Sequence, residues 1–207
     1  MIPVLCAAFV LMAVFYLLFE RMKDTPDNNS PKHIFIKCAA TSMAVLAALL
    51  GCLKSGTAAH LIMLVGLTVC AAADGVLCVH FLAGGGLFAL GHILYMAAFL
   101  VMRRPTWLSA VIFLVLMVPS AAVFIRFRGR IGPKFPFFCA YAAVLSAMVA
   151  LSSVQHPLCF LGALLFAFSD ALLAYLLSGG KSAALDRISL GAYYLGQFLL
   201  GLAVFVT

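Results

Sequence analysis

The sequence contains very little charge. Of its 207 residues, 9% are Asp, Glu, Lys or Arg and 66% are hydrophobic, and the mean hydropathy is +1.21. A soluble globular domain is charged at about a quarter of its positions. A core of this size cannot bury so much apolar surface, so lipid must cover much of it. The composition therefore predicts an integral membrane protein.

Several kinds of site are missing as well. The seven cysteines are scattered through apolar segments without a CxxC pair, which indicates packing rather than disulfides or a zinc site. The sequence has no GxSxG, no HExxH and no trio of intramembrane histidines, so we expect neither a metal nor a cofactor. The net charge of +7 comes from basic residues that lie between apolar runs. This placement predicts contact with lipid headgroups and no nucleic-acid partner.

Eight apolar runs are present, each near the ~20 residues that cross a bilayer as a helix. They predict an all-α polytopic membrane protein with about eight transmembrane helices in one bundle, forming a single domain over residues 1–207. The first run lacks the basic start of a signal peptide, so it is expected to be a span. The triplet Gly84-Gly85-Gly86 predicts a tight turn. The spans are expected at about 3–19, 34–53, 59–79, 85–102, 106–125, 135–152, 157–178 and 188–206.

The basic residues predict an orientation in the cell membrane. Nine of them flank the connections after the first, third, fifth and seventh spans, against three on the other side. Because cytoplasmic loops carry the excess of Lys and Arg, this side is expected in the cytoplasm and both termini outside it. The nine are Arg21, Lys23, Lys32, Arg126, Arg128, Arg130, Lys134, Lys181 and Arg187.

A weak internal echo relates the two halves of the chain. Asp74 precedes Gly84 by ten residues, and Asp170 precedes Gly180 by the same interval. This spacing favours a 4+4 parallel repeat about an axis along the membrane normal, with chance similarity among apolar helices as the alternative.

Polar side chains converge within the predicted spans. Asp74 and Asp170 are acids inside long apolar runs, where a carboxylate costs about 2.5–3.5 kcal/mol to insert. At ~1.5 Å per helical residue, they share a slab about 5–15 Å below the cytoplasmic interface with six other residues. These are Lys37, His92, Tyr95, Tyr193, Tyr194 and Gln197. Either the acids form a functional cavity, or they clasp helices together. Tyr194 diverges from Tyr193 by ~100° around the helix, so only one of them is expected to point well inward.

Four motifs around these residues resemble the YhhN, or lysoplasmalogenase-like, family of eight-span membrane proteins. Their order and spacing match across roughly residues 30–206. The motifs are "ADGVL" around Asp74, "LFALGHILYMAAF" with His92 and Tyr95, "FAFSDALLAY" with Ser169 and Asp170, and "GAYYLGQFLL" with Tyr193, Tyr194 and Gln197.

The resemblance implies cleavage of the vinyl ether bond of lysoplasmalogens, which gives a fatty aldehyde and a glycerophospho-headgroup. The partner would be a membrane lipid, lysoplasmenylethanolamine or lysoplasmenylcholine. Asp74 and Asp170 would supply acid–base catalysis, because vinyl ethers hydrolyse when an acid protonates carbon. The substrate site would include Lys37, His92, Tyr95, Ser169, Tyr193, Tyr194 and Gln197.

Two other classes of function also fit paired intramembrane acids. A proton-coupled transporter or channel would need a polar path through both leaflets. A non-catalytic lipid-binding or scaffold protein would use the acids only to hold helices together.

Overall fold

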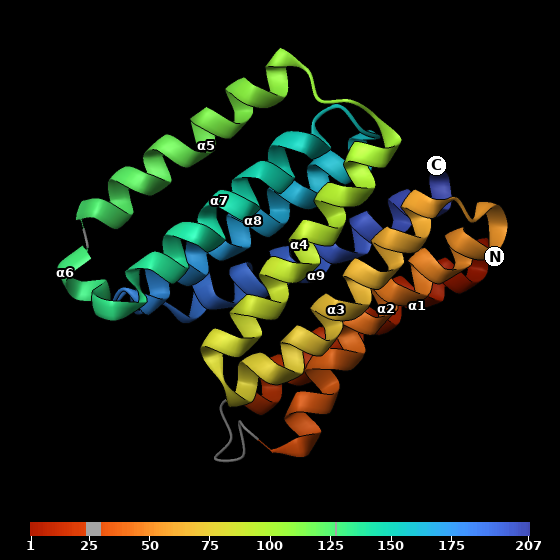
Figure 1. Ribbon diagram of the computed structural model, residues 1–207. Coiled ribbons are helices and arrows are strands. Elements are labelled where there is room, and N and C mark those ends of the chain that lie inside the picture. The colour runs from red at the N-terminus through yellow and green to blue at the C-terminus, as the bar shows by residue number, and fades with distance from the viewer. Residues whose placement is uncertain (24–29, 127) are drawn as a thin grey trace.

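The computed structural model describes residues 1–23, 30–126 and 128–207, and nearly all of them are helical. Eight long helices are accompanied by a single turn, α6, and a short 3-10 segment, η1 (Figure 1). The elements are α1 (Ile2–Lys23), α2 (Pro31–Ser55), α3 (Ala58–Val79), α4 (Phe81–Met102), α5 (Trp107–Arg126), α6 (Arg128–Ile131), η1 (Gly132–Lys134), α7 (Phe135–Ser152), α8 (Pro157–Leu177) and α9 (Ala183–Val206).

Eight helices of the described chain are long and apolar enough to cross a membrane. Each needs a run of about 20 apolar residues, and the backbone in lipid must satisfy its own hydrogen bonds, which a helix does. The all-α, eight-span prediction is therefore confirmed, and the chain is a multi-pass membrane protein.

Three helices extend four or five residues beyond the expected spans. The loop expected to begin at Glu20 is still helical through Lys23, and residues 24–29 of it lie outside the described residues. The fourth span begins at Phe81 instead of residue 85, because the His80 ring accepts a hydrogen bond from the Ala83 amide (3.2 Å). The last begins at Ala183 instead of 188, because Ser182 Oγ accepts from the Leu185 amide (3.2 Å). Such caps satisfy amides that have no partner inside the helix, and they fix where each helix starts.

The tight turn expected at Gly84-Gly85-Gly86 is wrong, because all three residues lie inside α4. A Cβ on Gly84 would come within 2.5 Å of the Leu77 Cα on α3. The absence of a side chain is therefore used for close helix packing, as small residues are in membrane bundles.

The two halves of the chain pack in a repeated pattern. The long pairings α3–α4 and α8–α9 correspond, as do α1–α2 and α5–α7, and the cross-half pairings α2–α9 and α4–α7. Gly66 lies eight residues before Asp74 and faces Gly91, just as Gly162 lies eight before Asp170 and faces Gly196. In the second pair, a Cβ on either glycine would lie 2.8 Å from the other's carbonyl oxygen. These corresponding contacts agree with the predicted 4+4 parallel repeat.

The repeat is broken on one side. α2 packs along much of α3, whereas their counterparts α7 and α8 contact each other over a shorter stretch. α1 packs on both α2 and α9, whereas α5 packs mainly along α7 and lies at the outer edge of the bundle (Figure 1). The second half is therefore looser than the first.

The N- and C-termini lie at the same end of the bundle (Figure 1). The opposite end contains the close of α1, α3, α5 and α8 and the start of α2, α4, α7 and α9. We call it the basic end, because eight described basic side chains lie there. They are Arg21, Lys23, Lys32, Arg126, Arg128, Lys134, Lys181 and Arg187.

Candidate active site

A cavity of about 620 Å³ opens in the half of the bundle nearest the basic end. Both aspartates line it, Asp74 about 8 Å and Asp170 about 11 Å along their helices from that end, at ~1.5 Å per residue. The volume is that of a pocket for a ligand of moderate size. Of the other sequence-predicted residues, Lys37, Ser169 and Tyr193 also line the cavity.

Three side chains contact the carboxylate of Asp74. Its side chain is 1% exposed, and its Oδ1 lies 3.3 Å from Lys37 Nζ on α2. Its Oδ2 accepts hydrogen bonds from the Tyr193 hydroxyl on α9 (2.7 Å) and from the Thr41 hydroxyl on α2. An ion pair together with two hydroxyl donors is the environment of an ionised carboxylate.

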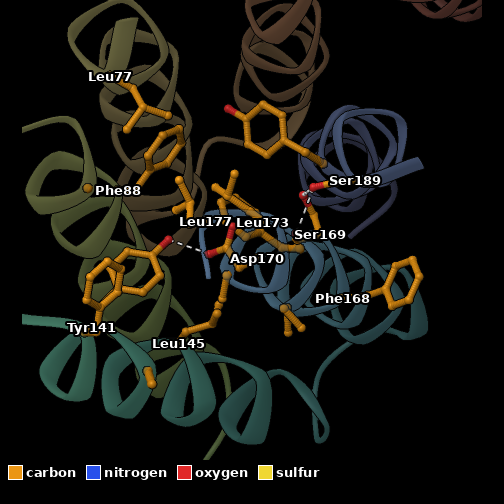
Figure 2. A pocket seen from close by; sticks show the side chains of 18 of the residues that line it. Leu77, Phe88, Tyr141, Leu145, Phe168, Ser169, Asp170, Leu173, Leu177 and Ser189 are labelled. Carbon is orange, nitrogen blue, oxygen red and sulfur yellow. Dashed lines mark hydrogen bonds between the residues drawn. The ribbon is translucent and has the colours of Figure 1, made fainter. Parts of the chain in front are cut away.

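Asp170 has a different environment. The Tyr141 hydroxyl on α7 donates a hydrogen bond to Asp170 Oδ2 at 2.6 Å (Figure 2). Leu145 and Leu173 line the same cavity as Asp170 (Figure 2). Among the residues that the structure describes, no Lys or Arg ion-pairs with Asp170, in contrast to Asp74.

An aromatic cluster lies beside the carboxyl groups. The rings of Phe88, Phe166 and Tyr193 meet edge to face, with centroids 5.3–5.9 Å apart. All three line the cavity. The cluster therefore forms an aromatic part of the cavity wall.

Three further sequence-predicted residues lie behind the cavity wall. The Tyr95 hydroxyl donates to Gln197 Oε1 at 2.9 Å, joining α4 to α9 in the buried interior. His92 packs its ring against Phe166 (4.5 Å between centroids) and lies 3.4 Å from the Tyr141 hydroxyl through Nε2. These residues support the side chains that face the cavity.

The remaining two candidates, Tyr194 and Ser169, join neighbouring helices. Tyr194 stacks edge to face with Tyr16 of α1 (6.1 Å), whereas its neighbour Tyr193 points to Asp74. Ser169 lines the cavity, and its carbonyl oxygen accepts from the Ser189 hydroxyl at 2.9 Å (Figure 2). This contact joins α8 to α9 beside Asp170.

Charged side chains surround the mouth of the cavity. Lys23 and Asp186 both line it and form an ion pair. Glu20 lies 3.4 Å from Lys23 and 3.4 Å from Arg187. These contacts connect the end of α1 to the start of α9, so the cavity ends in a zone of mixed charge.

Thr41 and Tyr141, which donate hydrogen bonds to the two aspartates, were not among the site residues predicted from the sequence. Thr41 lies four residues after Lys37, so both share one face of α2, and this spacing could have indicated it. Tyr141 lies within a run of aromatic and small residues, "FPFFCAY", and its role depends on which way α7 faces Asp170. No signal in the sequence marks that orientation.

The described residues contain no group of three or more His, Cys, Asp or Glu placed to hold a metal ion. In comparisons with known proteins, the family model described as "YhhN family" matches residues 32–204, which is most of the chain. No curated protein matches the chain, and no solved structure does.

Proposed function

Because the chain belongs to the YhhN family, we propose that it is a membrane hydrolase that cleaves the vinyl ether bond of lysoplasmalogens. The products are a fatty aldehyde and a glycerophospho-headgroup. The observation that carries the proposal is the pair of aspartates in one cavity, one held as an ion pair and the other by a single tyrosine hydroxyl. Their environments suit two different roles.

A vinyl ether resists bases and nucleophiles, and its reactive site is the β-carbon of the double bond. A proton added to that carbon leaves a positive charge shared by the α-carbon and the ether oxygen. A catalyst therefore needs a protonated acid to start the reaction and an anion to stabilise the cation. Paired carboxyl groups in unequal surroundings meet both needs.

Asp170 is the better candidate for the acid, because an unpaired carboxyl group among apolar side chains favours its neutral form. It donates its proton to the β-carbon. Asp74, anchored by Lys37, Thr41 and Tyr193, stabilises the cation and accepts a proton from the attacking water. The hemiacetal that forms collapses to aldehyde and alcohol. Asp74 passes the proton taken from water to the departing glycerol oxygen, and the proton of the hemiacetal hydroxyl returns to Asp170, so both carboxyl groups regain their starting states.

The aromatic cluster and the charged residues at the cavity mouth also have roles in the proposed reaction. Phe88, Phe166 and Tyr193 flank the space where the cation forms, and such contacts contribute about 0.5–2 kcal/mol. Lys23 and Lys37 supply positive charge for the lipid phosphate, and Asp186 supplies negative charge for an amine in the headgroup. The headgroup would thus lie toward the basic end, where a bilayer places headgroups.

A transporter would need a polar path that continues from the cavity to the opposite end of the bundle, where the N- and C-termini lie. Two of the polar side chains at that end bond to helix backbone. Lys54 donates to the Phe205 carbonyl (3.1 Å), and Gln155 donates to the Phe99 carbonyl (3.1 Å). These contacts hold helix ends together, which favours a hydrolase that works from one side.

The direct test is an assay of purified protein in detergent with lysoplasmenylethanolamine, following aldehyde release. The matched control is the 1-acyl lysophospholipid with the same headgroup, which contains an ester in place of the vinyl ether. Aldehyde from the first lipid and no fatty acid from the second would support the proposal. If no vinyl ether lysolipid, with ethanolamine or choline, yields aldehyde, the proposal is wrong.

A further inference from the structure

The part of the cavity that α5, α7 and α8 line beyond Asp170 is mostly apolar, and we call it the apolar arm. From Asp170 it continues between α7 and α8, where Ala142, Ser146, Ala167 and Ala171 line it. These small side chains lie where α7 and α8 pack less closely than their counterparts α2 and α3. The space between the two helices is therefore built into the second half of the fold.

α5 covers the outside of this arm with one face. Leu116, Ser120 and Phe124 line the cavity at intervals of four residues, so they form one stripe about 12 Å long at ~1.5 Å per residue. The opposite face of the helix is exposed at Val115 and Val118. Leu164 of α8 lines the arm and is itself exposed, so the arm reaches the surface that lipid covers.

We propose that this arm holds the single hydrocarbon chain of the lysolipid and opens sideways to the bilayer between α5 and α8. The inference rests on the proposed function. It adds the subsite for the chain and the route by which the lipid arrives, within the leaflet next to the basic end.

The position of the reacting bond supports this arrangement. The vinyl β-carbon is the second carbon of the hydrocarbon chain, so the chain must begin at the acid that protonates it. Asp170 lies on α8 at the start of the arm, and Leu164 lies about 9 Å further along the same helix at ~1.5 Å per residue. On the other side of the cavity are Lys23, Lys37 and Asp186, which suit a headgroup. A lipid placed this way has its charged headgroup beside the charged side chains and its hydrocarbon chain against the apolar lining.

The test is photocrosslinking in nanodiscs with a saturated 1-alkyl ether lysolipid that has a diazirine at the end of its chain. Because this probe has no vinyl ether, it is not cleaved, and labelling does not depend on hydrolysis. We expect adducts, mapped by mass spectrometry, on peptides that contain Leu116, Ser146 or Leu164. Excess unlabelled long-chain lysolipid should remove them, since a site saturates and bulk lipid does not. Adducts confined to exposed faces such as Val115, and insensitive to competitor, would overturn the proposal.

A pair of variants tests the same arm by chain length. Ser146→Phe fills it about 16 Å along α7 from the basic end, at ~1.5 Å per residue. We expect labelling by an 18-carbon probe to fall at least tenfold and labelling by a 4-carbon probe, whose chain ends before Ser146, to persist. Val115→Phe on the exposed face of α5 is the control and should change neither, while Ser146→Leu is a milder filling variant in case the first misfolds. Equal labelling of wild type and both Ser146 variants by the long probe would contradict the proposal.

The two proposals fail in different ways. If the arm is labelled but no lipid yields aldehyde, the chain subsite stands and the hydrolase assignment is wrong. If aldehyde forms but the arm is not labelled, only the chain subsite is wrong.

Discussion

At the scale of single residues, the two aspartates occupy corresponding positions in the repeat and yet have different partners. Asp74 meets a cation and two hydroxyl groups, whereas Asp170 meets Tyr141. A symmetric pair would have no reason to divide acid and base roles between its members. The side chains that α2 places beside Asp74 differ from those that α7 places beside Asp170, and this difference creates the division.

Changing each aspartate to asparagine separates chemistry from architecture, because the amide keeps the shape and cannot deliver the proton. Asp74→Asn and Asp170→Asn should each lower turnover by on the order of 10²-fold or more. The double variant should lose little beyond the worse single one, since the pair acts as a unit. Well-folded Asn variants that release aldehyde at the wild-type rate would end the hypothesis of an aspartate pair.

The same two variants should differ in stability. Asp74→Asn leaves Lys37 without its counter-ion, so the free energy of unfolding should fall by on the order of 1–3 kcal/mol. Asp170→Asn removes an acid that ion-pairs with no Lys or Arg among the described residues, so it should leave stability unchanged or higher. Thermal unfolding of the purified variants in one detergent measures the difference. Equal losses in both would mean that the acids serve chiefly to clasp helices.

Tyr141 should act as a positioning residue through its hydrogen bond to Asp170. Tyr141→Phe keeps the ring that packs beside His92 and removes only the hydroxyl donor. We expect kcat to fall by roughly 10-fold with KM nearly unchanged, because the loss of one such bond costs about 0.5–1.5 kcal/mol. Tyr175→Phe, at an exposed tyrosine of α8, is the control and should have wild-type kinetics. A rise in KM alone would instead place Tyr141 in lipid binding.

At the scale of helices, close packing depends on glycine where two backbones meet. The α8–α9 contact has Gly162 against Gly196, and the α3–α4 contact has Gly66 against Gly91. Each of these pairs lies on the helices that present the aspartates and the aromatic cluster. Their spacing therefore sets the width of the cavity.

Gly196→Ala should destabilise the α8–α9 pair, because the new Cβ would lie 2.8 Å from the Gly162 carbonyl oxygen. Overpacking of this kind costs about 1–3 kcal/mol. Gly86→Ala is a matched control within α4, since nothing lies within 4 Å of its added Cβ and alanine is the better helix former. Thermal unfolding should rank Gly196→Ala below wild type and Gly86→Ala at or above it. The reverse order would show that the helices separate easily at Gly196.

Much of this structure could be predicted from the sequence, and the limit has a physical cause. Apolar runs near 20 residues identify the eight helices, and isolated acids inside them identify Asp74 and Asp170. The rotation of each helix was harder to predict, because a span such as α4 is apolar on every side and periodicity gives no face. Tyr141 was therefore missed. Thr41 could have been predicted from its spacing to Lys37, and Gly84-Gly85-Gly86 was misread because runs of glycine usually mark turns. The wider spacing of α7 and α8 depends on packing between distant segments, which the local pattern does not record.

At the scale of the whole molecule, the basic residues and the cavity occupy the same end of the bundle. The cavity mouth includes Lys23 and Asp186. The neighbouring helix ends contain Arg126 and Arg128, and the connection between α8 and α9 contains Lys181. If lipid arrives from the leaflet at this end, the membrane orientation decides which leaflet supplies the substrate. The excess of Lys and Arg predicts the cytoplasmic leaflet.

Cysteine labelling in sealed cells tests that orientation. In a variant without native cysteines, Arg128→Cys at the basic end should resist a membrane-impermeant maleimide until the cells are opened. Trp107→Cys, at the exposed start of α5 and thus at the opposite end of the bundle, should react in intact cells. Because one helix separates the two positions, each serves as the control for the other. Labelling of Arg128→Cys but not Trp107→Cys in intact cells would reverse the orientation. The cavity would then draw its lipid from the outer leaflet, although its geometry and its pair of acids would be unchanged.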